Sequence, residues 1–105
     1  MRILFDQGTP APLRGALPCH VVATAHEMGW AMLANGDLLN AAQASFDAFV
    51  TTDQNLRYQQ NLSGRQLAIL ILWTTSWPKL QRHLPQITAA IGALRAGDFV
   101  ELNFS

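Results

Sequence analysis

Runs of apolar residues, separated by polar and turn-forming residues, divide the chain into five predicted strands. Short apolar and β-branched runs are typical of strands inside a parallel sheet, whereas alternation of apolar and polar residues is typical of an edge strand with one solvated face. The longest apolar run, 67–72, is predicted to be central and buried on both faces, and the alternating run 99–104 is predicted to be an edge. The other predicted strands are 2–5, 20–23 and 48–51.

Helical patterns lie between these strands, and several of them open on a capping residue or a proline. Thr9 and Pro10 begin the first helix, and Asp37 begins another after a turn. Strands that alternate with helices predict one domain over 1–105 with an α/β fold: a three-layer α/β/α sandwich with a mostly parallel central sheet and right-handed crossovers. The predicted helical segments are 10–17, 24–30, 37–45, 54–62 and 78–94, the last with a kink at Pro85.

The chain is apolar for its length. Of its 105 residues 50% are hydrophobic and 13% are charged, against about 25% charged in an average domain. So little charge predicts that another chain covers part of the surface, and we expect a homo-oligomer. The net charge of zero provides no overall field that would recruit nucleic acid or an anionic membrane, so a polyanion would have to be held by local contacts.

Location follows from the same composition. No apolar run is long enough to span a membrane, and the first residues do not form a signal peptide, so we expect a cytoplasmic protein without a membrane partner. Cys19 is the one cysteine of the chain. It cannot form an internal disulfide, and we expect it to be a small buried residue.

Acidic residues follow the ends of predicted strands. Asp6 comes directly after the first strand and Asp53 after the third, while Asp37 opens a helix and Glu27 lies on the connection after the second strand. Because ligands bind at the carboxyl edge of a parallel sheet, we expect these carboxylates at one crevice. Bound Mg²⁺ or Mn²⁺, which prefer hard oxygen ligands, would relieve their mutual repulsion. The alternative is that each acid only stabilises the N-terminus of a helix.

Other site chemistries have less support. The chain contains neither of the glycine-rich phosphate-binding motifs and no H-E-x-x-H zinc motif, so its three histidines are expected to be structural. Trp30, Trp73 and Trp77 are able to stack on bases. In so apolar a chain, however, we expect these tryptophans in the core or in subunit contacts.

Two motifs carry a resemblance to a known family. The block V-T-T-D-Q-N-L at 50–56 and the helix start G-D-L-L at 36–39 follow a first strand that ends on Asp6. In this order they resemble the PIN-like proteins, and most of all a short branch of uncharacterised domains that are often taken to be toxin-like nucleases. The resemblance covers nearly the whole chain. At one position the chain departs from the family pattern, because Gly8 stands where a small polar side chain is usual.

The resemblance implies a metal-dependent ribonuclease that cleaves single-stranded RNA with Mg²⁺ or Mn²⁺. By position it implicates Asp6, Asp37 and Asp53 in metal binding and catalysis, with Glu27 as a fourth metal ligand. It also implies an antitoxin-like protein partner. The residues expected to contact the substrate are Thr52, Asn55, Arg57, Arg14 and Arg65.

Two other functions remain open. A PIN-like fold without catalysis would act as an interaction module, which the low charge and Gly8 favour. A phosphoacceptor receiver would also place Asp6 and Asp53 after the first and third strands, with Thr74 after the fourth. Against the receiver, Gln7 stands where that fold has a second acid, and no lysine follows the last strand.

Overall fold

The strands β3 (Ala48–Thr51) and β4 (Ala68–Ile71) contain no exposed residue, and each lies between two other strands of one sheet. A computed structural model describes residues 1–56 and 65–104, and every pair of neighbouring strands in it runs parallel. The order across the sheet is β2 (Val21–Thr24), β1 (Arg2–Phe5), β3, β4 and β5 (Phe99–Glu101). The predicted α/β class and parallel central sheet are confirmed.

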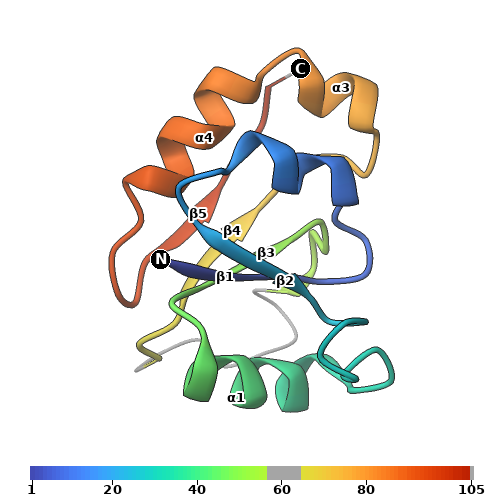
Figure 1. Ribbon diagram of the computed structural model, residues 1–105, viewed down its shortest axis with the longest axis vertical. Helices are drawn as coiled ribbons and strands as arrows, with labels where there is room; N and C mark the ends of the chain where they lie inside the picture. Colours follow the sequence, from blue (N-terminus) through green and yellow to red (C-terminus); the bar gives the residue numbers. More distant parts are fainter. Residues whose placement is uncertain (57–64, 105) are drawn as a thin grey trace.

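Helices cover both faces of this sheet (Figure 1). A 3₁₀ helix, η1 (Ala11–Ala16), lies on one face together with α3 (Trp77–Gln81) and α4 (Leu84–Gly92). The helix α1 (Asn35–Ser45) lies on the other face. The chain therefore forms the three layers of an α/β/α sandwich.

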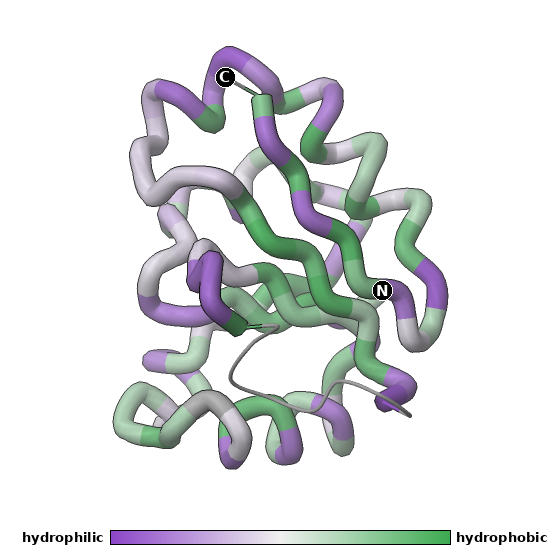
Figure 2. The backbone as a smooth tube through the Cα atoms, turned by 180° about the vertical axis from the view of Figure 1, so that it is seen from behind, coloured by the Kyte–Doolittle hydropathy of each residue, from purple (hydrophilic) through white to green (hydrophobic). Residues whose placement is uncertain are grey.

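Alternation along the strands supplies an apolar surface to each helical layer, since successive side chains of a strand point to opposite faces. In β1, Ile3 and Phe5 pack in the cluster that contains Leu13 of η1, whereas Leu4 packs in the cluster that contains Leu39 of α1. Figure 2 shows the result: hydrophobic strands run through the centre, and hydrophilic positions lie on the surrounding helices and turns.

Membrane-spanning helices are absent from the described part of the chain. Its longest helix, α1, has 11 residues. At 1.5 Å per residue it is about 16 Å long, roughly half of the hydrocarbon thickness of a bilayer.

The last crossover departs from the expected handedness. The connection from β1 through η1 to β2 and the connection from β4 through α3 and α4 to β5 move in opposite directions across the sheet, yet both lie on the same face (Figure 1). Two such connections have opposite hands, so they cannot both be right-handed. One consequence is that α3 packs beside η1. Another is that Thr75, just before α3, lines the same hollow as Asp6 after β1.

Pro85 begins a helix and does not bend one, contrary to the prediction. The predicted helix 78–94 is two helices, α3 and α4, and Pro85 lies in the first turn of α4. The missing N–H of a proline needs no partner there, because the first N–H groups of a helix have none within the helix.

Other element bounds differ by a few residues from those predicted. The second strand is shifted by one residue, and the last strand ends at Glu101, although its place at the sheet edge is confirmed. The helix predicted to open on Asp37 begins two residues earlier, so Asp37 lies in its first turn and is not its cap. Gly29 closes the turn after β2 with a φ of 76°, as expected of a glycine there. Most of the predicted helix 54–62 lies outside the described residues.

Cys19 is exposed, contrary to the prediction that it is buried. It lies in the turn between η1 and β2, where no strand or helix covers it.

A core truncation tests the double burial of β4. Leu70 is fully buried in this strand, so Leu70→Ala should lower the free energy of unfolding by about 2–5 kcal/mol through lost transfer energy and a cavity. Urea denaturation measures the change. The matched control is Leu33→Ala, because the Leu33 side chain is 38% exposed and its truncation should cost far less. Equal losses for the two variants would contradict the burial of β4.

Candidate functional site

Asp6 is held at the carboxyl end of β1 by hydroxyl and amide groups. Its Oδ1 accepts hydrogen bonds from Thr9 N at 3.1 Å and from Thr9 Oγ1 at 2.8 Å, and its Oδ2 accepts one from the hydroxyl of Thr51. The Thr9 hydroxyl also lies 2.9 Å from the carbonyl oxygen of Val50, so its single proton serves one of these two acceptors at a time. Both carboxylate oxygens of Asp6 are thereby oriented by the protein.

The hydroxyl of Thr51 also connects Asp6 to Asp53. Besides donating to Asp6, it accepts a hydrogen bond from Asp53 N at 3.1 Å. The Asp53 Oδ1 in turn accepts from Asn55 N at 2.9 Å and so caps the turn after β3. Because β2 and β3 flank β1 in the order of the sheet, this seam between β1 and β3 is the topological switch point at which open α/β sheets bind ligands.

Two hollows flank Asp6. The larger, of about 400 Å³, lies on the side of η1 and is lined by Asp6 together with Gln7, Gly8, Thr9, Pro10, Ala11, Thr24, His26 and Thr75. The smaller, of about 190 Å³, lies on the side of α1 and includes Trp30, Leu33 and Leu38 in its lining. Asp6 is thus reached from two sides of the carboxyl edge, and His26 is a polar neighbour that the sequence prediction did not assign to the site.

The predicted group of three or four acids is not assembled among the described residues. Within 1–56 and 65–104, no three acid, histidine or cysteine side chains lie close enough to hold one metal ion. Asp37 is exposed in the first turn of α1, and its carboxylate forms no hydrogen bond with another described residue, although the next residue, Leu38, lines the smaller hollow. Glu27 is engaged elsewhere, by Arg14 and the Thr24 backbone.

Arg14 and Glu27 form an ion pair on the surface between η1 and the turn after β2. The Glu27 carboxylate also accepts from Thr24 N at 2.9 Å, and these contacts, first of all the hydrogen bond from Arg14, hold the pKa of Glu27 below its ordinary value of 4.5. Two residues that were assigned separate roles, metal binding and phosphate contact, are therefore partners of each other.

The other predicted substrate residues have different surroundings. Arg65 donates to Asn40 Oδ1 at 3.0 Å and so reaches the surface of α1, away from Asp6. Thr52 and Asn55 lie on the loop after β3, where the Asn55 side chain is exposed. Arg57 lies outside the described residues.

Gly8 permits a close approach between the loops that follow β1 and β3. A Cβ atom at this position would lie 2.5 Å from Thr52 Oγ1, which is closer than side chains tolerate. The small polar residue of the family pattern would therefore collide with Thr52 in this arrangement. Thr9, one residue later, supplies the hydroxyl beside Asp6 instead.

The donors at the seam suit a hard divalent cation. Asp6 presents its carboxylate beside both hollows, while Asp53 is joined to it through its backbone N–H and uses its own carboxylate to cap the turn after β3. Mg²⁺ commonly uses one or two carboxylates and keeps several waters. The described residues therefore fit an ion held by one or two carboxylates and by waters better than a cage of four acids.

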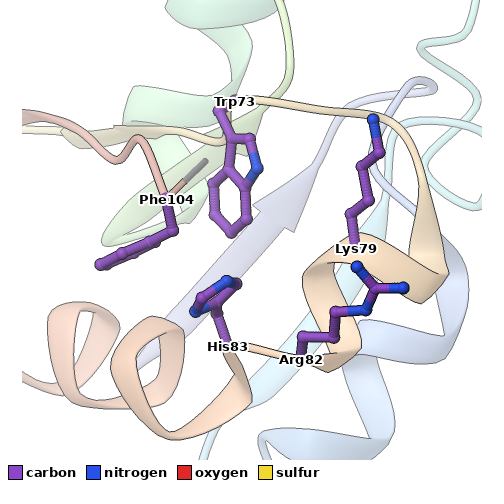
Figure 3. A pocket seen from close by; sticks show the side chains of 5 residues that line it. All are labelled: Trp73, Lys79, Arg82, His83 and Phe104. Carbon is purple, nitrogen blue, oxygen red and sulfur yellow. The ribbon is translucent and has the colours of Figure 1, made fainter.

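A third hollow lies at the same sheet edge, beyond β4 and β5, and sequence analysis did not find it. It has a volume of about 350 Å³ and is lined by Trp73, Lys79, Arg82, His83 and Phe104 (Figure 3). We call it the aromatic-basic pocket. The signal in the sequence was the spacing of Lys79, Arg82 and His83, since residues three and four apart share one side of a helical segment.

None of the protein-family models, curated proteins or solved structures with which the chain was compared matches it. The resemblance to PIN-like proteins therefore rests on the sequence motifs.

Removal of Arg14 should raise the pKa of Glu27 toward 4.5, because the largest contribution to its lowering is the hydrogen bond from Arg14. A lowered folded-state pKa stabilises the fold above the unfolded-state value, and this contribution is lost as the pH falls through the folded-state pKa. An NMR titration of wild type and Arg14→Gln measures the shift, with Arg95→Gln as a control on an exposed arginine. An unchanged Glu27 titration in Arg14→Gln would rule out the ion pair.

The hydroxyl group of Thr51 should contribute more to the free energy of unfolding than the methyl group of the same side chain. Thr51 is 1% exposed, so Thr51→Val leaves the Asp6 carboxylate and the Asp53 N–H without this partner and should lower the free energy of unfolding by about 1–3 kcal/mol. Thr51→Ser keeps the hydroxyl and should lose about 1 kcal/mol for the methyl group. Urea denaturation compares the two variants, and a valine variant more stable than the serine variant would contradict the role of this hydroxyl.

Proposed function

We propose that the chain is a PIN-like ribonuclease that cleaves single-stranded RNA with Mg²⁺ or Mn²⁺. The observation that supports this most is the connection of Asp6 to Asp53 through the Thr51 hydroxyl, at the switch point of the sheet and beside two hollows. Carboxylates on the loops at that edge are what an ion-dependent phosphodiesterase needs. The sequence resemblance points to the same chemistry.

In this proposal Asp6 and Asp53 hold the ion, and Thr9 and Thr51 fix the orientation of the Asp6 carboxylate. The ion, when bound, supplies Lewis-acid activation of water and of the phosphoryl oxygens. Asp37 is the third carboxylate assigned to the ion. It lies in the first turn of α1, and the next residue, Leu38, lines the smaller hollow. Glu27 holds no ion in this proposal, because its carboxylate forms an ion pair with Arg14. That ion pair stabilises the turn after β2.

Self-association, a cytoplasmic location and an antitoxin-like partner belong to the same proposal. Support for a partner chain comes from the low charged fraction of 13% and from exposed apolar side chains. Val21 is 64% exposed and Met32 is 96% exposed. Covering such side chains removes apolar surface from water and favours association.

A second candidate is a PIN-like module that binds a partner without catalysis. The specific observations in its favour are that no three acids come together among the described residues and that Glu27 is committed to Arg14. The loop geometry around Gly8 adds to this, because a side chain with a further oxygen ligand at that position would require the Thr52 side chain to move.

Cleavage of single-stranded RNA should depend on the seam. Asp6→Asn and Asp53→Asn should each lower the rate at least about 100-fold, because loss of a ligand that holds a catalytic ion removes several kcal/mol of transition-state stabilisation. Chelation with EDTA should stop the reaction. The matched control is Asp47→Asn, since Asp47 accepts from Arg2 N at 2.8 Å at the opposite edge of the sheet.

Gel assays of labelled RNA with purified protein distinguish the candidates. Equal cleavage by wild type, Asp6→Asn and Asp53→Asn would mean that the activity comes from a contaminant or another site. If wild type cleaves nothing and its melting temperature does not respond to millimolar Mn²⁺, the ribonuclease proposal fails and the interaction module takes its place.

A further inference from the structure

The rings of the aromatic-basic pocket are fixed by one another. Trp73 meets His83 edge to face, with ring centroids 5.7 Å apart, and meets Phe104 in the same way at 5.2 Å. His83 and Phe104 are stacked at 5.0 Å with an angle of 16° between their planes. Because Trp73 follows β4, Phe104 follows β5 and His83 precedes α4, three separate segments hold these rings. A planar ligand would meet an aromatic surface that is already formed.

Two cations complete the pocket. In Figure 3, Lys79 and Arg82 lie on one side of Trp73 and Phe104 lies on the other. Both cationic side chains are exposed, and neither forms an ion pair within the described part of the chain. The described residues that line the pocket include no acid. This combination of aromatic faces and uncompensated positive charge suits a ligand that is both planar and anionic.

His83 also brings an unpaired polar atom to this part of the chain. Its Nδ1 is buried and has no hydrogen-bond partner among the described residues. Buried polar atoms in proteins nearly always have a partner, and a water or a ligand group would supply one here.

The pocket is close to the seam along the sheet edge. Trp73 lines the pocket, and Thr75, two residues later, lines the larger hollow beside Asp6. Gln54, next to Asp53, donates to the carbonyl oxygen of Leu72, next to Trp73. One short loop thus separates the two places, and a single extended strand of nucleic acid could contact both.

We propose that the aromatic-basic pocket binds one nucleotide of single-stranded RNA, with its base on the aromatic rings and its phosphate at Lys79 and Arg82. The choice of RNA as the strand rests on the proposed function. Base stacking on protein aromatic rings is tolerant of sequence, so the pocket would hold a nucleotide beside the reacting phosphate without selecting its base strongly. An acidic peptide would use the two cations but would have no use for three rings.

The test separates binding from cleavage. It uses the full chain as the Asp6→Asn variant in EDTA, so that nothing is hydrolysed, and follows the indole N–H signal of Trp73 by NMR. The probes are a short oligoadenylate, AMP, adenosine, inorganic phosphate and an acidic peptide. The oligoadenylate should bind most tightly, AMP should bind more tightly than adenosine or phosphate, and all bound nucleotides should shift the Trp73 signal.

Variants assign the contacts. Lys79→Gln and Arg82→Gln change exposed side chains and should each weaken oligoadenylate binding and reduce the slope of log K against log salt by about 0.7. Phe104→Leu keeps an apolar side chain but removes a ring, and should weaken binding about 5- to 150-fold. The matched control is Arg95→Gln, an exposed arginine outside the pocket, which should leave binding and slope unchanged.

Several results would overturn the proposal: phosphate binding as tightly as AMP, the acidic peptide displacing the oligoadenylate, AMP binding more tightly than the oligoadenylate, or Lys79→Gln and Arg82→Gln behaving like Arg95→Gln. The outcome is independent of catalysis. If oligoadenylate binding needs these residues but the wild type cleaves no RNA, the nucleotide-binding proposal is supported and the ribonuclease proposal fails. If the wild type cleaves RNA but the pocket variants bind the oligoadenylate as tightly as before, the ribonuclease proposal is supported and the nucleotide-binding proposal fails.

Discussion

Burial of the central strands on both faces determines how the rest of the molecule is arranged. A strand with no exposed residue needs an apolar layer on each side, and η1, α3 and α4 provide one layer while α1 provides part of the other. Crossover connections between successive strands make all five strands parallel, so that their carboxyl ends meet at one edge. Polar side chains excluded from the strands gather there. The position of Asp6 and Asp53 at the same sheet edge is therefore a consequence of packing.

The seam between β1 and β3 shows how a polar group is accommodated next to such a core. Thr51 is nearly buried, and its hydroxyl is used twice, as donor to Asp6 and as acceptor from Asp53 N. Thr9 supplies the other carboxylate oxygen of Asp6 with an amide and a hydroxyl partner. These contacts keep Asp6 in one orientation, which favours binding because little side-chain freedom is lost when a ligand arrives. They also mean that any cation at Asp6 shares its oxygens with these donors.

The local pattern of apolar and polar residues was enough to predict most strands and helices. The features that it did not predict depend on contacts between residues far apart in the sequence. The third strand was predicted with its observed bounds, because a short apolar run lies between Asp47 and Thr52. The break between α3 and α4 was missed because apolar spacing continues through Pro85, and only the fold shows that the chain needs two shorter helices there. Pairing of Arg14 with Glu27 joins two loops, and no periodicity encodes it. The same holds for the aromatic-basic pocket, whose rings come from segments that meet only in the folded sheet.

The use of the basic residues links the two parts of the carboxyl edge. The chain has seven lysines and arginines and no net charge, so a polyanion must be attracted by those that remain uncompensated. Arg14 is neutralised by Glu27, Arg65 donates to α1, and the guanidinium of Arg2 lies 5.1 Å from the ring centre of Phe46. Lys79 and Arg82 remain together on one short segment, beside three aromatic rings and one loop away from Asp6. Because screening confines their attraction to about 8–10 Å at ordinary salt, they act on a strand that already lies along this edge and do not draw one in from a distance. Recognition by this chain would therefore depend on stacking and contact and not on electrostatic steering.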